Sequence, residues 1–122
     1  MKIKHFEDLD SWKKARELTN IIYELTGEEN FRRDFRLCHQ LRDASGSAMH
    51  NIAEGFDAGS DAEFIRFLKI ARRSVSEVQS QLYLALDRQY ISKTQLQNAY
   101  GKATEVKRLI NGLIAYLRGN KK

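Results

Sequence analysis

The stretch SDAEFIRFLKIARRSVSEVQSQLYLA, residues 60–85, decides the fold class of this chain. Ser60 followed by Glu63 is typical of a capping box, in which two side chains satisfy free backbone groups at the start of a helix. Apolar residues then recur at steps of three and four, which places them on one face of an α-helix. That stripe consists of Phe64, Leu68, Ala71, Val75, Val78, Leu82 and Ala85. We therefore expect a long helix over residues 61–89.

Three further segments carry the same periodicity, and they predict helices over residues 9–26, 32–55 and 93–118. Ser92 and Gln95 form a second capping-box pattern before the last of them. The sequence contains no proline, so no proline kink interrupts these patterns. The connections are short except between the first two helices, which favours antiparallel packing of consecutive helices. The expectation is one all-α domain over residues 1–122, an antiparallel up-down-up-down four-helix bundle with Trp12 buried.

Composition places the chain among ordinary globular proteins. Of its 122 residues, 42% are hydrophobic and 30% are charged, so neither a disordered nor a membrane protein is indicated. No apolar run approaches the roughly 20 residues that a membrane span requires. The first residues show no apolar segment followed by a cleavage site, and Cys38 is the only cysteine. We expect a cytoplasmic protein in which Cys38 is a small core residue.

The segment Asn51-Ile52-Ala53-Glu54-Gly55-Phe56, preceded by Gln40-Leu41-Arg42, Ala44 and Ser47, carries a family resemblance. It resembles the signature of a bacterial four-helix bundle family first noticed in intervening sequences of large-subunit ribosomal RNA genes. The similarity extends over nearly the whole chain. Further agreement comes from Phe6, Asp8, Leu9, Trp12, Ala15, Glu63, Phe64, Phe67, Leu68, Ala71, Arg72 and the segment Tyr90-Ile91-Ser92.

The resemblance implies a four-helix bundle that forms closed homo-oligomers, with five subunits as the expected number. A related bundle is the accessory protein of diversity-generating retroelements, where it is linked to nucleic acid and reverse transcriptase. The chain departs from the family pattern at Asp43, where a second arginine is usual, and at Ala48 and Met49, which replace a bulkier residue and a proline. Helix two is therefore expected to be straighter here.

A polar stripe borders the apolar face of the second predicted helix. Ser47, Asn51 and Glu54 fall within about 60° of one another on a helical wheel. Polar groups at such a boundary need hydrogen-bond partners, and Arg72 or Arg73 of the third helix are candidates. We interpret the stripe as a structural network of Ser47, Asn51, Glu54 and Arg72. A ligand-binding or catalytic role for Glu54 is the alternative.

Candidate catalytic and metal-binding residues are few. His39 and His50 on one helix would lie roughly 16 Å apart, too far to share a metal ion. No nucleophile and base or phosphate-binding loop stands out, so we expect no enzyme, no cofactor and no metal. The alternative rests on Arg33 and His39, whose spacing resembles that of certain all-helical ribonucleases that act on an RNA phosphate.

Positive charge is concentrated at the C-terminal end. Residues 1–91 contain 14 lysines and arginines against 15 aspartates and glutamates, whereas residues 92–122 contain 7 against 1. The basic residues of the last helix occupy one arc, and they are Lys93, Lys107, Arg108 and Arg118. Two interpretations stay open: weak, sequence-tolerant binding of RNA or DNA, or contact with an acidic surface of a neighbouring subunit.

The third helix carries more apolar residues than one core can cover. Ile65, Ile70, Tyr83 and Leu84 point away from the stripe that begins at Phe64. Several exposed apolar side chains on one helix mark an interaction surface. We therefore interpret these four residues as a homo-oligomer interface.

Overall fold

The computed structural model describes residues 1–120, and within them it contains four α-helices and no strand. The helices are α1 (Asp10–Thr26), α2 (Phe35–Phe56), α3 (Asp61–Asp87) and α4 (Lys93–Ala115). Short helical turns flank them, namely η1 (Phe6–Asp8), η2 (Phe31–Arg33) and η3 (Tyr116–Asn120). The all-helical prediction is confirmed.

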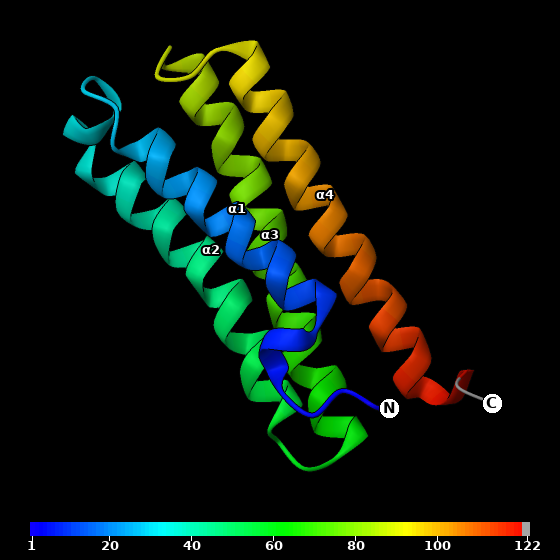
Figure 1. The fold of residues 1–122 in the computed structure, drawn as a ribbon. Helices are drawn as coiled ribbons and strands as arrows, with labels where there is room; N and C mark the ends of the chain where they lie inside the picture. Colours follow the sequence, from blue (N-terminus) through cyan, green and yellow to red (C-terminus); the bar gives the residue numbers. More distant parts are fainter. Residues whose placement is uncertain (121–122) are drawn as a thin grey trace.

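The four helices form a bundle in which each packs against two neighbours. Helix α1 lies against α2 and α4, and α3 lies against the same two helices. Both chain ends lie at the end of the bundle where α2 turns into α3 (Figure 1). The bundle therefore has four lines of contact between helices, which we call the α1–α2, α2–α3, α3–α4 and α1–α4 seams.

The predicted apolar stripes form the core. Every member of the α3 stripe is buried, and the stripes of the other helices supply fully buried side chains such as Leu18, Leu41 and Ile110. Cys38 is also buried, as expected, and burial raises the pKa of its thiol. None of the helices within residues 1–120 is long and apolar enough to cross a membrane.

The prediction that Trp12 is buried is wrong, because its side chain is only half-buried. Its ring meets the ring of Phe6 in an edge-on contact, with centroids 5.2 Å apart. The guanidinium of Arg16 lies over the same ring, 5.8 Å from its centroid. Trp12 thus covers the flank of the core beside η1, and one part of its ring stays in contact with solvent.

Helix ends follow the predicted capping patterns only in part. Ser92 and Gln95 make both hydrogen bonds of a capping box. Ser60 accepts from the Glu63 backbone, but the Glu63 side chain pairs with Arg66 instead of completing the box. Helix α2 begins three residues later than predicted, because η2 precedes it and the Asp34 side chain caps it.

At the α2–α3 seam, Gly55 of α2 lies so close to α3 that a side chain would not fit there. A Cβ atom placed on Gly55 would lie 2.8 Å from Cδ1 and 3.2 Å from the carbonyl oxygen of Phe64, and 2.9 Å from Cβ of Phe67. Such distances leave no room for a methyl group unless α3 moves. Gly46, on the same helix, has no such neighbour within 4 Å.

Replacing these two glycines should change stability in opposite directions. Gly55→Ala should destabilise the bundle by about 1–3 kcal/mol, because overpacking displaces α3. Gly46→Ala should stabilise it by about 0.5–1 kcal/mol, because alanine is the better helix former where there is space. Urea unfolding followed by circular dichroism measures both. A Gly55→Ala variant as stable as the wild type would contradict the close contact.

Candidate nucleic-acid interface

The four basic residues predicted on the last helix do not form one site. Lys93 is the first residue of α4, and Arg118 lies beyond its end in η3. At 1.5 Å per residue, the two are separated by roughly 37 Å. Lys107 and Arg108 lie between them and line a surface hollow together. The structure therefore places two of the four residues at a common site.

Helix α3 adds three cations that sequence reasoning did not assign to this site. Lys69, Arg72 and Arg73, with Ser76, line a hollow of about 480 Å³ against Lys107 of α4. Their spacing in the sequence places Lys69, Arg72, Arg73 and Ser76 along one side of the helix. This spacing could have predicted a basic side of α3 from the sequence. The charges of residues 1–91 nearly balance, so their total gave no indication of it.

A second hollow of about 380 Å³ continues the first along the α3–α4 seam. Lys107 lines both hollows, so they form one surface feature, which we call the α3–α4 groove. The polar and aromatic residues of the second hollow are Gln79, Tyr100, Thr104 and Asn111, and Arg108 is its second cation.

Neutral acceptors hold the cations that cross the groove. Arg72 donates through Nη1 to Oδ1 of Asn111 at 2.7 Å, and Lys107 donates through Nζ to Oε1 of Gln79 at 3.1 Å. Gln79 is 6% exposed, and its amide nitrogen donates to the Thr104 hydroxyl at 3.0 Å. These bonds orient the basic side chains and leave their charge uncompensated.

Among residues 1–120, no carboxylate side chain lines the groove. Across residues 1–120, Lys69, Arg73 and Arg108 make no ion pair, and all three are exposed. Glu77, one turn after Arg73, lines neither hollow. Clustered charge of one sign raises the local concentration of counter-ions. The lining of the α3–α4 groove therefore favours negatively charged groups over positive ones.

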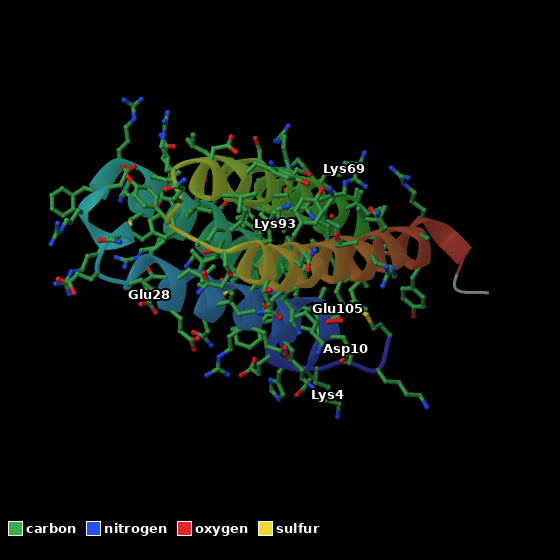
Figure 2. The ribbon with its side chains drawn as sticks, turned by 90° about the horizontal axis from the view of Figure 1, so that it is seen from above. Lys4, Asp10, Glu28, Lys69, Lys93 and Glu105 are labelled. Atoms are coloured by element: carbon green, nitrogen blue, oxygen red, sulfur yellow. The ribbon has the colours of Figure 1, made fainter. Side chains whose placement is uncertain are left out.

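The α1–α4 seam on the other flank of α4 is built differently. The Nζ atom of Lys102 lies 2.8 Å from a carboxylate oxygen of Glu17 and 3.7 Å from one of Glu105. The Nζ atom of Lys14 lies within 3.5 Å of both carboxylates. The hydrogen bond from Lys102 lowers the pKa of the Glu17 carboxyl below its ordinary value. Figure 2 shows Glu105 on the flank of α4 that faces α1, and Lys69 on the α3 side. Lys14 and Lys102 are thus paired on the α1 flank of α4, where Arg108 also borders a hollow lined by Asp8 and Asp10. Within residues 1–120, the cations that line the α3–α4 groove make no ion pair.

The predicted polar network forms in part. Ser47 shares a hydroxyl–hydroxyl bond of 3.0 Å with Ser74 of α3, and the Asn51 amide donates to the Ser47 carbonyl and hydroxyl. Glu54 is exposed and has no hydrogen bond within the described chain. Arg72 does not join this network, because it reaches across the opposite seam to Asn111.

The structure does not bring Arg33 and His39 together. Arg33 lies 3.7 Å from Glu29 in an exposed ion pair, and Nε2 of His39 lies 3.8 Å from Oδ2 of Asp43. A shallow hollow of about 630 Å³ on the outside of α2 includes His39, His50 and Glu54 but not Arg33. Within residues 1–120, no three histidine, cysteine, aspartate or glutamate side chains are grouped as metal ligands would be.

The four apolar residues predicted at an oligomer interface differ in exposure. Ile65 is half-buried and packs against the core, and Ile70 is half-buried as well. Tyr83 is 51% exposed, and its ring lies edge-on to that of Tyr100, with centroids 5.7 Å apart. Leu84 is 42% exposed. Two of the four residues are thus exposed on the isolated chain.

Comparison with known proteins agrees with the resemblance seen in the sequence. The chain belongs to the 23S rRNA-intervening sequence protein family, whose model matches residues 7–112. It is similar to a crystal structure of a protein of unknown function from the S23 ribosomal protein family of Bacteroides thetaiotaomicron VPI-5482. That likeness has a TM-score of 0.77 and 27% sequence identity, and covers 85% of this chain and 97% of the other. No curated protein matches the chain.

Proposed function

We propose that this bundle is a non-enzymatic module that binds the phosphate backbone of nucleic acid in the α3–α4 groove. The observation that carries the proposal is the groove's lining, which has five cations and no carboxylate. Those cations are Lys69, Arg72, Arg73, Lys107 and Arg108.

The groove carries the chemistry of backbone recognition. Arginine forms bidentate hydrogen bonds with phosphate, and lysine contributes a point charge. Hydroxyl groups such as those of Ser76 and Thr104 are also common partners of phosphate and sugar. Phosphate contacts position a nucleic acid without reading its sequence. We therefore expect sequence-tolerant binding, with Kd of about 10⁻⁴ to 10⁻⁶ M at physiological salt.

A catalytic role for Arg33 and His39 receives no support from their positions. Their side chains are 72% and 78% exposed, and each is directed to its own carboxylate partner. RNA cleavage by such a pair would need both groups at one phosphate. The different carboxylate partners of Arg33 and His39 support the non-enzymatic proposal.

Charge reversal in the groove should weaken binding more than the same change elsewhere. Arg73→Glu with Arg108→Glu removes two exposed cations, so affinity for labelled oligonucleotides should fall at least about tenfold and its salt dependence should decrease. Fluorescence anisotropy between about 50 and 200 mM salt measures both quantities. The matched control, Lys13→Glu with Arg32→Glu, makes the same change in net charge outside the groove.

Three outcomes would contradict this proposal in whole or in part. Equal weakening by the control would mean that net charge, not the groove, attracts nucleic acid. Absence of binding by the wild type at low salt would remove the function altogether. Gel analysis of the same RNA incubations reports cleavage, and cleavage that His39→Ala abolishes would contradict the non-enzymatic part.

Self-assembly is a second candidate function, favoured by the exposure of Leu84 in the last turn of α3. Tyr83 and Leu84 are consecutive, so their side chains point about 100° apart, and only Tyr83 contacts α4 through Tyr100. The Leu84 side chain points away from the core and lies outside the α3–α4 groove. A cyclic contact between identical subunits would cover it. The family resemblance implies five subunits.

Assembly should depend on Leu84. Size exclusion with light scattering should give about five times the chain mass of 14.2 kDa for the wild type. Leu84→Lys should lower that mass while the helical circular dichroism stays unchanged, because a charge cannot be buried unpaired. Asn20→Lys adds the same charge at an exposed position of α1, away from Leu84, and should leave the assembly intact. A wild-type monomer at micromolar concentration would end this candidate.

A further inference from the structure

Two tyrosines mark the end of the α3–α4 groove nearest the α3–α4 loop. Tyr100 lines the second hollow with Lys107 and Arg108, and Tyr83 of α3 lies against it. Their rings are inclined by 67°, so the edge of one meets the face of the other. Tyr83 remains 51% exposed. Within residues 1–120, neither phenol hydroxyl makes a hydrogen bond, so the pair presents aromatic surface beside the cations.

We propose that the groove selects single-stranded nucleic acid over duplex, with Tyr83 as the surface on which an unpaired base stacks. This inference rests on the proposed function, because it takes the phosphate contacts of the groove as given. Basic grooves that hold a backbone beside aromatic rings are the usual way in which proteins bind single strands. Bases in a duplex are already stacked and paired, so they cannot lie on Tyr83.

The layout of the groove suits a single strand. Its cations follow the seam between α3 and α4, so one extended backbone can contact them in turn. Tyr100 and Lys107 are two turns apart on α4, a distance of roughly 10 Å along the axis. A strand lying in the groove therefore contacts Lys107, Arg108 and Arg72 with its phosphates while a neighbouring base reaches Tyr83.

The polar groups between these positions suit a backbone better than a base edge. The amide of Gln79 is occupied, since it accepts from Lys107 and donates to Thr104 and to the Tyr100 carbonyl. Asn111 is occupied at its oxygen by Arg72. The aromatic rings thus supply the base contact, and this contact is independent of sequence because every base has a π-face.

Substitutions at Tyr83 separate stacking from charge. Labelled single strands of about 16 nucleotides, as RNA and as DNA, are compared with the matching duplex and with inorganic polyphosphate as a competitor. Wild-type protein should bind both single strands more tightly than the duplex. Tyr83→Leu, which keeps apolar bulk without a π-system, should weaken single-strand binding about tenfold, whereas duplex binding should be unchanged. Tyr83→Phe should retain wild-type affinity, because the ring is kept.

Each remaining outcome decides the question. If wild-type protein binds single strands, duplex and polyphosphate equally, the inference is wrong while the proposed function stands. If Tyr83→Leu weakens single-strand and duplex binding by the same factor, Tyr83 is structural and the inference is also wrong. If nothing binds at low salt, both proposals fail. Should Tyr83→Leu not fold, the wild-type ratio of single-strand to duplex affinity decides the question.

Discussion

The close contact between α2 and α3 at Gly55 is the constraint on which the rest of the arrangement depends. Phe64 and Phe67 lie where a side chain on Gly55 would have to be, so α2 and α3 approach closely at this level. Hydrogen bonds between Ser47 and Ser74 and from Gln81 to Gln40 continue the same seam along both helices. Because α2 occupies that flank of α3, the opposite flank faces α4, and this is the flank that carries the cations of the groove.

The seams of the bundle differ in whether their charged side chains are paired with opposite charges. This difference relates the fold to the proposed function. The α2–α3 seam is closed by neutral hydroxyl and amide groups. The α1–α4 seam pairs Lys14 and Lys102 with Glu17 and Glu105, so its charges cancel locally. Only the lining of the α3–α4 groove combines several cations with neutral acceptors. Repulsion among those cations is a cost to the folded state, and a bound phosphate backbone would relieve it.

The sequence predicted the helices because their apolar stripes and the capping box at Ser92 are local signals. It predicted too early a start for α2, since the η2 turn and the Asp34 cap depend on how the preceding loop folds. The candidate site was predicted only on its α4 side. A helical wheel describes one helix at a time, so it could not show that Arg72 faces Asn111 across a seam. It also grouped Lys93 with Arg118, although the length of α4 separates them.

The most direct test of the central claim is to record which amides respond when a single-stranded oligonucleotide is added to isotope-labelled protein. If nucleic acid binds in the α3–α4 groove, the largest shift changes in nuclear magnetic resonance spectra should occur on both sides of that groove. The amides of residues such as Arg72, Ser76 and Lys107 should shift, and so should the side-chain amide of Asn111. The α1–α4 seam around Lys102 should be nearly unchanged. Changes confined to another basic surface, such as the exposed arginines at the start of α2, would contradict the account.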